Sequence, residues 1–410
     1  MPKDIKAPEL SSIEAAFTKC RKKSETMNRF ISATAFALSL ALTAVALPRG
    51  AFAFETAAEY AVLMDYESGS ILWGKNADEQ MHPASMSKLM TLDMLFGAIR
   101  DGSVSLDDEF KVSENAWRKG GAASGSSTMF ADLNTVVPVH AILRGIIVQS
   151  GNDACIATAE ALSGSESAFA EALTERGKAI GLTNSNFTNS TGWPDEDHLM
   201  TAHDLAVLAR HIIMEFPEFY PIFKETDFTW NGIKQGNRNP ALYLDPSVDG
   251  LKTGHTEASG YGLVASAKRG DQRLILVLNG LPSERARADE SVRLLDWGFR
   301  SFKHYKLFTA GTPVENAPVW QGTYGEVPLV SQTDIDVILS TEQRRNMKVS
   351  VLYDTPVAAP VAAGQRIGTI RIEAPDMPVR EFPLVAGGAV ERQGIFGRAM
   401  GALKHMILGG

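Results

Sequence analysis

The sequence predicts an α+β fold, in which helices cover one antiparallel sheet, followed by a second, small all-β domain and a C-terminal amphipathic helix. Three patterns support this prediction. Hairpin patterns lie at residues 58–76 and 261–280, helical periodicity dominates the chain between them, and short alternating strands rich in Val, Pro and Gly follow residue 306. Because strands stand at both ends of the helical region, we expect both ends to contribute to a single sheet.

The chain begins with a pattern typical of a secretory signal. A basic stretch leads into the apolar run ISATAFALSLALTAVAL and then into the small residues AFA at 51–53. We therefore expect residues 1–53 to form a signal peptide that is removed after Ala53, with Met27 as an alternative start. An uncleaved membrane anchor is the other interpretation, although the apolar run is short for a bilayer span.

Composition and charge limit the class of protein. The 410 residues are 44% hydrophobic and 21% charged, as in soluble globular proteins, and the length suits two domains. Residues 1–53 contain eight Lys or Arg and four Asp or Glu, so their removal changes the formal net charge from −8 to −12 (32 basic minus 44 acidic residues). Such an acidic chain is not expected to bind nucleic acid. Cys155 is then the only cysteine, which excludes an intramolecular disulfide.

The first predicted domain covers residues 54–303. Its first hairpin, AEYAVLMDYESGSILWGKN, turns at a Glu-Ser-Gly-Ser sequence, and its last, YGLVASAKRGDQRLILVLNG, turns at Gly-Asp. Between and after the hairpins apolar residues recur at helical spacing, and Gly102 ends the first of these segments. The predicted helices cover residues 85–102, 138–149, 153–164, 165–182, 201–216 and 283–302.

Two smaller regions complete the chain. Residues 304–390 are predicted to form the small all-β domain, from alternating runs such as MKVSVLYD and RIGTIRIEA. In the tail, residues 391–410, the apolar side chains fall on one face at 100° per residue, whereas Arg398, Lys404 and His405 lie off it. We expect a basic amphipathic helix that lies in a membrane surface, with docking on the β domain as the alternative.

Ser85 and Lys88 are the first candidates for chemistry. Ser-x-x-Lys arises by chance about once or twice in a chain of this length, and Ser85 would also suit a helix N-cap. Positions i and i+3 share a helix face, however, so the ammonium can reach the hydroxyl. A serine hydroxyl needs a base, and lysine can act as one only if burial or a nearby cation lowers its pKa. Ser87 would point about 100° away from Lys88 and is the weaker candidate.

Two further short patterns supply what the first lacks. Lys252-Thr253-Gly254 stands on a predicted strand that leads into the last hairpin, where glycine would allow a ligand backbone close to the strand. Its lysine is the cation that we expect to lower the pKa of the first one. Ser150 and Asn152 lie in a break between two helices, where a hydroxyl and an amide can serve as proton shuttle and substrate clamp. Alone, Ser-Gly-Asn would be an ordinary turn.

In this order and at these separations the three patterns form a specific signature. Ser-x-x-Lys, Ser-Asp-Asn and Lys-Thr-Gly are typical of penicillin-binding proteins and class A β-lactamases. The chain closely resembles the low-molecular-mass penicillin-binding proteins, which are serine-type D-alanyl-D-alanine carboxypeptidases with a β-lactamase/transpeptidase-like fold. One departure is visible, Gly151 in place of the aspartate of the second motif. The resemblance rests on SMSKLMT, GSSTMF, RGIIVQSGNDAC, NSTGW, TAHDLAVLA, VDGLKTGHT and LLDWGFR, and extends over nearly all of the chain after residue 53.

The resemblance implies roles for the reactive side chains. Ser85 would be the acylated nucleophile and Lys88 its proton acceptor. Ser150 would relay a proton toward the leaving amine, and Asn152 would bind the amide of the substrate.

It also implies a set of binding residues on the strand and the last helix. Lys252 would supply positive potential, and Thr253, Gly254 and His255 would line the strand that binds the substrate. The backbone N–H groups of the nucleophile and of His255 would form the oxyanion hole. Arg287 would help to hold the terminal carboxylate, although a surface contact, or the arginine two positions earlier, is the alternative.

The implied function is removal of the terminal D-alanine from peptidoglycan stem pentapeptides through an acyl-enzyme, with β-lactams as covalent inhibitors. The resemblance places the protein at the periplasmic face of the bacterial inner membrane. No cofactor or metal is expected, because no Cys/His cluster has zinc-site spacing. Three nearby histidines, His198, His203 and His211, are expected to face different directions.

Three alternatives remain open at this stage. A class A β-lactamase shares the motifs but uses a glutamate and a water to deacylate, and Asp195, Glu196 and Asp197 are the candidates here for that role. An endopeptidase that cleaves cross-links between stem peptides has the same residues. A wall-binding protein without catalysis is disfavoured, because the reactive side chains of all three motifs are present.

Overall fold

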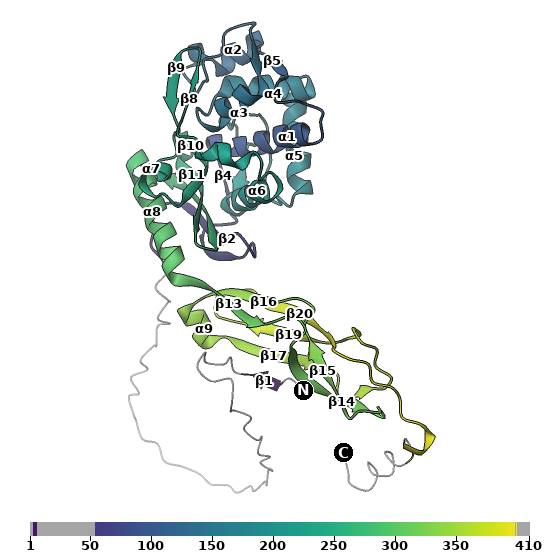
Figure 1. Cartoon of the computed structure of the whole chain (residues 1–410). Coiled ribbons are helices and arrows are strands. Elements are labelled where there is room, and N and C mark those ends of the chain that lie inside the picture. Colours follow the sequence, from purple (N-terminus) through teal and green to yellow (C-terminus); the bar gives the residue numbers. More distant parts are fainter. Residues whose placement is uncertain (1–2, 6–53, 398, 400–410) are drawn as a thin grey trace, which may run out of the picture. The chain divides into compact units, whose positions relative to one another are not determined.

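The computed structural model describes residues 3–5, 54–397 and 399, and these residues form two compact units (Figure 1). One unit contains Glu55–Phe308 and Asp334–Arg345. The other contains Thr309–Thr333, the described residues after 345 and the short strand at residues 3–5. The expected signal peptide, apart from residues 3–5, and most of the expected C-terminal helix lie outside the described residues.

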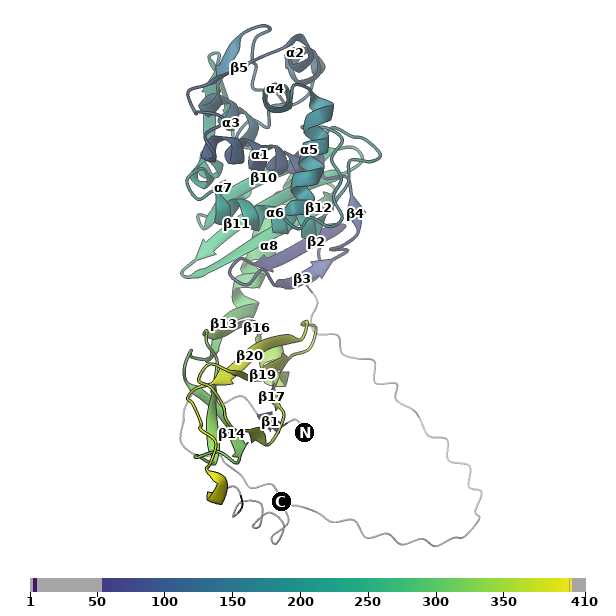
Figure 2. The same cartoon turned by 90° about the vertical axis from the view of Figure 1, so that its right-hand side faces the viewer.

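A five-stranded antiparallel sheet forms the centre of the first unit, and both ends of its sequence contribute, as the hairpin patterns predict. The last long strand pairs with the first strand of the first hairpin through neighbours such as Val277 and Val62. Its strand order is β10 (Val248–Thr256), β11 (Gly260–Arg269), β12 (Gln272–Leu281), β2 (Tyr60–Asp65) and β3 (Ile71–Lys75) (Figure 2).

The two faces of this sheet bury different side chains because strand residues alternate in direction. Val62 and Met64 belong to the main hydrophobic core, together with residues of α1 and α6. On the other face, the side chains of Leu63 and Leu274 approach the backbone of Gly298 in α8. The sheet is therefore buried on both faces, and the expected α+β architecture is confirmed.

The helical region lies between the two strand-forming ends of the first unit. Its helices begin where the sequence supplies caps: the hydroxyls of Ser113, Ser165, Thr201 and Ser283 each accept a hydrogen bond from the backbone N–H three residues later. The helices are α1 (Lys88–Arg100), α2 (Glu114–Gly120), α3 (Val139–Ile147), α4 (Asn152–Ser163), α5 (Glu166–Ala179), α6 (Ala202–Glu215), α7 (Ala241–Leu244) and α8 (Glu284–Ser301).

Short elements that the periodicity does not predict connect these helices. They consist of two-stranded ribbons and single 3-10 turns, which are too brief to show a repeating pattern. The ribbons pair β4 (Gln80–Met81) with β7 (Met200–Thr201), β5 (Glu109–Lys111) with β6 (Val136–Pro138), and β8 (Asp227–Trp230) with β9 (Ile233–Gly236). The 3-10 turns are η1 (Ala84–Ser87), η2 (Ala122–Ser124) and η3 (Tyr220–Lys224).

The second unit contains a seven-stranded sheet, in agreement with the prediction of a separate all-β domain. Near the sequence boundaries between the two units lie a further two-stranded ribbon and a short helix. The ribbon pairs β13 (Phe302–Phe308) with β16 (Ile335–Ser340), and the helix is α9 (Thr341–Asn346). None of the helices that the structure describes is both long and apolar enough to cross a membrane. The sheet order is β1 (Lys3–Ile5), β17 (Lys348–Tyr353), β19 (Arg366–Glu373), β20 (Arg380–Ala386), β15 (Glu326–Val330), β14 (Pro313–Trp320) and β18 (Val357–Ala358).

Candidate active site

Ser85 and Lys88 are brought together where η1 continues into α1. Ser85 is half-buried in the 3-10 turn, and Lys88 is the first residue of the helix. The Lys88 Nζ donates a hydrogen bond to Ser85 Oγ at 2.8 Å and a second one to the backbone carbonyl of Thr191. Ser87, not Ser85, occupies the N-cap position of α1, and its hydroxyl donates to the Ala84 carbonyl. Ser85 is therefore left with the lysine as its partner.

Burial lowers the pKa of Lys88 and so makes it a better candidate for the base. Its side chain has no exposed surface, and burial lowers its pKa from about 10.5 to about 8. The guanidinium of Arg238, in the loop between β9 and α7, lowers the pKa further, whereas the carboxylate of Glu166 raises it. Of the two causes that we considered, burial has the larger effect, and the cation that lowers the pKa of Lys88 is Arg238 rather than the expected Lys252.

A second serine–lysine pair stands beside the first. Lys252 on β10 donates from its Nζ to Ser150 Oγ at 2.8 Å, and Ser150 precedes α4 with a left-handed φ of 60°. Only 2% of Lys252 is exposed, and burial, followed by repulsion from Lys88, holds its pKa well below the usual range. The left-handed φ of Ser150 is energetically costly for a residue other than glycine, and such residues cluster at functional sites. Each lysine thus holds one serine hydroxyl, and the two lysines lie within electrostatic reach of each other.

Asn152 is the first residue of α4 and is 5% exposed. Its Oδ1 accepts no hydrogen bond from the described residues. The neighbouring Asp153 fixes this end of the helix, because its carboxylate accepts hydrogen bonds from the Thr128 hydroxyl at 2.6 Å and from the Met129 N–H at 2.9 Å. Asn152 therefore presents a buried acceptor on a rigid support. Burial of a polar atom without a partner is costly unless a ligand provides one.

Two glycines allow three segments to meet at the nucleophile. A Cβ on Gly254 of β10 would lie 2.8 Å from the carbonyl oxygen of Pro83, so the residue that we expected to admit a ligand also admits the chain's own η1 turn. A Cβ on Gly192 would lie 2.0 Å from the Ala84 carbonyl oxygen, at a φ of +75°. The loop at residues 189–193 can reach Lys88 only because of this glycine.

His255, Tyr261 and Arg287 form a row at the other end of the site. The rings of His255 and Tyr261 stack with centroids 3.8 Å apart, and the guanidinium of Arg287 lies 5.6 Å from the Tyr261 ring centroid. Thr253 is buried beside them on β10, and Arg287 is 5% exposed. Arg287 lowers the pKa of Lys252, which places it within electrostatic reach of that lysine.

Sequence reasoning missed several residues that shape this site. Arg238 donates a hydrogen bond to Ser127 and acts electrostatically on both lysines. Asn189 holds the loop, because its Oδ1 accepts from the N–H groups of Thr191, Gly192 and Trp193 at 2.8–3.1 Å. The Asn-x-x-Gly within NSTGW offered a turn signal for the loop. No local pattern marked Arg238.

The remaining sequence candidates have partners other than the two serines. His198 is buried, with its pKa lowered to about 4 by burial, and its Nδ1 faces the Thr188 N–H. His203 contacts Asp78, and His211 contacts Asp93. The three histidines therefore have different partners, as expected. Of the three acidic candidates for deacylation, Asp195 lines a cavity next to Asn152.

The fold and the two buried serine–lysine pairs define the class: a serine hydrolase of the penicillin-binding type. The chain belongs to the D-alanyl-D-alanine carboxypeptidase family, which matches it over residues 45–282. Residues 302–392 match the family described as penicillin-binding protein 5, C-terminal domain. The family resemblance predicted from the motifs is thereby confirmed.

Relatives of known identity agree over most of the chain. It is 38% identical over 378 residues to D-alanyl-D-alanine carboxypeptidase DacC of Escherichia coli (strain K12), covering 92% of this chain and 94% of that one. It is 38% identical to the solved penicillin binding protein 5 from Haemophilus influenzae, covering 84% and 100% of the two chains with a TM-score of 0.72. It is also 25% identical to penicillin-binding protein D2 from Listeria monocytogenes in the ampicillin-bound form, covering 60% and 98% with a TM-score of 0.52.

Proposed function

We propose that this enzyme removes the terminal D-alanine from peptidoglycan stem pentapeptides through an acyl-enzyme on Ser85. The observation that carries the proposal is the hydrogen bond from the buried Lys88 to Ser85, at a lysine whose pKa is about 8. A lysine with that pKa is neutral often enough at neutral pH to accept the serine proton.

The first half of the reaction uses both serine–lysine pairs. Neutral Lys88 takes the proton from Ser85 Oγ, which attacks the carbonyl carbon between the two D-alanines. The negative charge that develops on the oxygen is stabilised by the backbone N–H groups of Ser85 and His255. Ser150, held by Lys252, relays a proton to the departing nitrogen: it donates its own proton and takes up the one that Lys88 removed from Ser85, so that Lys88 is neutral again. The C–N bond breaks, and free D-alanine leaves. Water then hydrolyses the ester and restores the serine.

The terminal carboxylate of the substrate would lie on the cationic side of the site. Lys252, Arg238 and Arg287 each contribute positive potential there, and Thr253 adds a hydroxyl on β10. A carboxypeptidase needs this arrangement, because only a substrate with a free terminal carboxylate gains the interaction.

We also propose that β-lactams acylate Ser85, as the ampicillin-bound form of the Listeria relative supports by similarity. The test is mass spectrometry of the protein after treatment with benzylpenicillin, followed by digestion to locate the adduct. We expect one adduct, on Ser85, and its loss in Ser85→Ala. Ser87→Ala is the matched control, because Ser87 lies two residues away and donates to the Ala84 carbonyl instead.

The outcomes separate the alternatives. An unmodified Ser85 would refute the mechanism, and rapid turnover of nitrocefin would make the β-lactamase the better assignment. A persistent adduct together with release of D-alanine from a pentapeptide supports the carboxypeptidase.

The proposal also covers the localisation of the protein and the role of each of its domains. We infer that residues 1–53 direct export and are removed, that residues 54–303 carry catalysis, and that residues 304–390 form the β-rich domain. The basic amphipathic pattern of residues 391–410 supports peripheral attachment to the periplasmic face of the inner membrane.

A further inference from the structure

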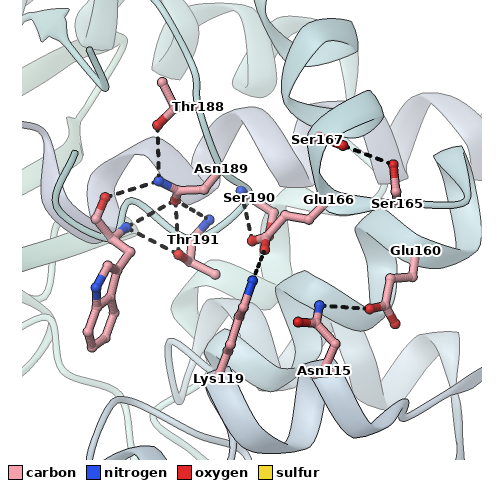
Figure 3. Close-up of polar contacts among 12 residues, drawn as sticks. Asn115, Lys119, Glu160, Ser165, Glu166, Ser167, Thr188, Asn189, Ser190 and Thr191 are labelled. Carbon is pink, nitrogen blue, oxygen red and sulfur yellow. Dashed lines mark hydrogen bonds and ion pairs between the residues drawn. The ribbon is translucent and has the colours of Figure 1, made fainter. Parts of the chain in front are cut away.

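Ser190 stands in the loop at residues 189–193 and is held by side chains from two helices. The hydroxyl of Thr91 on α1 donates a hydrogen bond to the Ser190 carbonyl at 2.7 Å. The Ser190 hydroxyl donates to Oε1 of Glu166 on α5 at 2.9 Å, and the Ser190 N–H reaches the same oxygen at 3.4 Å (Figure 3). Ser190 is 1% exposed and Thr91 is fully buried, so water hardly competes for these contacts. The loop is thus clamped between α1 and α5 at this residue.

The next residue of the loop contacts the base. The carbonyl of Thr191 accepts a hydrogen bond from Lys88 Nζ, which also contacts Ser85 Oγ at 2.8 Å. Thr91 lies three positions after Lys88, so the helix that carries the base also holds the loop that contacts it. Because Ser190 and Thr191 are adjacent in the chain, a shift of the first moves the carbonyl of the second.

The Thr191 carbonyl determines where the amine of Lys88 presents its lone pair. A neutral lysine has two N–H donors and one lone pair, whereas a carbonyl oxygen can only accept. The hydrogen bond to Thr191 therefore uses an N–H and leaves the lone pair for the proton of Ser85. A lysine side chain has many rotamers, and a fixed acceptor selects among them. The rate of proton transfer thus depends on the position of this carbonyl.

Glu166 is held firmly enough to anchor the loop. It is the first residue of α5, where the helix N-terminus attracts a negative charge, and its side chain is 17% exposed. Its Oε2 lies 3.9 Å from Nζ of Lys119, whose side chain is 66% exposed. A pair this long and exposed is weak, so the buried contact between Oε1 and Ser190 is the stronger one.

We propose that Glu166 is a positioning residue for the acylation step. Through Ser190 it fixes the Thr191 carbonyl. This carbonyl in turn holds the amine of Lys88 toward Ser85. The inference rests on the proposed acyl-enzyme function and adds to it a residue that lies outside the three motifs.

The charge of Glu166 acts on the base separately from its hydrogen bonds, because it raises the pKa of Lys88. Substitutions can therefore separate the two effects. Loss of the hydrogen bonds is expected to lower the limiting rate of acylation at high pH, where the base is neutral. Loss of the charge is expected to move the midpoint of the pH profile to lower pH.

The test is the pH profile of the rate constant of acylation by benzylpenicillin, measured by stopped flow between pH 6 and 10. Glu166→Ala removes acceptor and charge, and is expected to lower the limiting rate about 10- to 100-fold, as for a misplacement of about 1 Å. Glu166→Gln keeps an oxygen that accepts from Ser190 and is expected to restore most of this loss. The midpoint of both variants is expected at lower pH. Ser190→Ala keeps the charge and is expected to lower the limiting rate without moving the midpoint.

Glu160→Ala is the matched control, because Glu160 is a partly buried glutamate on α4 whose carboxylate accepts from Asn115 on α2 at 2.9 Å (Figure 3). Its limiting rate and midpoint are expected to equal those of the unmodified enzyme. The final amount of adduct counts the folded molecules, whereas the rate constant reports the base. A loss of folded protein in any variant therefore does not imitate the expected result.

The outcomes distinguish this inference from the function on which it rests. Positioning by Glu166 is refuted if Glu166→Ala or Ser190→Ala keeps the limiting rate, if Glu166→Gln falls as far as Glu166→Ala, or if Glu160→Ala falls equally. In each of these cases an adduct on Ser85 of the unmodified enzyme leaves the proposed function intact. If the unmodified enzyme forms no such adduct, the proposed function itself fails.

Discussion

At the scale of single residues, the central feature is a cluster of cations that share one buried space. Lys88 and Lys252 have almost no exposed surface, and Arg238 acts on both of them. Each charge makes it harder for the others to stay protonated, so the cluster as a whole favours a neutral amine. The same charges attract an anionic substrate. Catalysis and recognition of the carboxylate therefore depend on the same side chains.

The pH dependence of acylation follows from this cluster. Because only neutral Lys88 accepts a proton, the rate constant of acylation by benzylpenicillin is expected to rise with pH and level off above the lysine pKa of about 8. Arg238→Gln removes a cation that lowers this pKa, so its profile is expected to shift to higher pH. Glu166→Gln removes an anion that raises it, so its profile is expected to shift to lower pH. Stopped-flow measurement between pH 6 and 10 gives the midpoints.

Arg285→Gln serves as the control, since this arginine is 91% exposed on α8 and its salt-bridge partner is Asp289. A midpoint that stays the same in all three variants would show that Lys88 does not set the profile.

The sequence made the catalytic side chains of this cluster predictable, because the three motifs name both serines and both lysines. Arg238 was not predictable, since it acts on segments far away in sequence and stands in no motif with a known spacing. Asn189 acts locally within NSTGW, where the turn signal could have marked it. The sequence named burial and a nearby cation as possible causes of the lowered lysine pKa, but it could not show which one is larger. A pattern can show that a lysine starts a helix, but the degree of burial depends on the packing of the whole unit.

At the scale of elements, the site exists because η1, β10 and the loop at residues 189–193 approach to van der Waals distance. Gly254 and Gly192 allow this approach, since a Cβ on the first would overlap the carbonyl of Pro83, just before η1, and a Cβ on the second that of Ala84, in η1. The loop in turn supplies the Thr191 carbonyl that orients Lys88. The position of the base, Lys88, therefore depends on backbone contacts between segments that are about 100 residues apart in sequence.

Replacement of Gly192 by alanine is expected to separate the loop from η1 and to slow acylation, with a loss of several kcal/mol in the free energy of unfolding. Gly164→Ala is the matched control, because Gly164 has nearly the same φ, +76°, and no neighbour within 4 Å of its Cβ position. It reports the backbone strain alone, about 1–2 kcal/mol. Chemical denaturation and penicillin labelling measure both effects. Equal losses in the two variants would show that the overlap with Ala84 does not matter.

The longer elements were predictable from the sequence because their periodicity extends over several turns. The six predicted helices correspond to α1, α3, α4, α5, α6 and α8, and both hairpins belong to the central sheet. The short ribbons and 3-10 turns were missed. One of them, η1, carries Ser85, so the nucleophile stands in a turn before the helix rather than within it.

At the scale of the whole molecule, the second unit adds an all-β domain to a complete catalytic unit. Each unit has its own sheet and buried apolar side chains. The serine–lysine pairs lie entirely within the first unit. We therefore expect the second unit to position the enzyme or to bind partners, and not to take part in the chemical step.

Attachment to a membrane is tested on this scale. A mature chain that ends at Val390 is expected to lose most of its sedimentation with anionic phospholipid vesicles, because it lacks the basic amphipathic segment. Its rate of acylation by benzylpenicillin is expected to equal that of the mature chain with the tail. Vesicles of neutral phospholipid are the control for the contribution of charge. Undiminished sedimentation of the shortened chain would show that another part of the protein binds the lipid.

The central sheet has a consequence for the time course of biosynthesis. β2 ends at Asp65, whereas its partner β12 begins at Gln272, so about 200 residues must be added before the two can pair. At about 5–20 residues per second, ribosomal synthesis takes on the order of 10–40 s over that interval. Until then the first hairpin has an unpaired edge, and Ser85 is present without Lys252. Nascent chains are thus open to premature strand pairing and chaperone binding, and insensitive to penicillin, until synthesis passes β12.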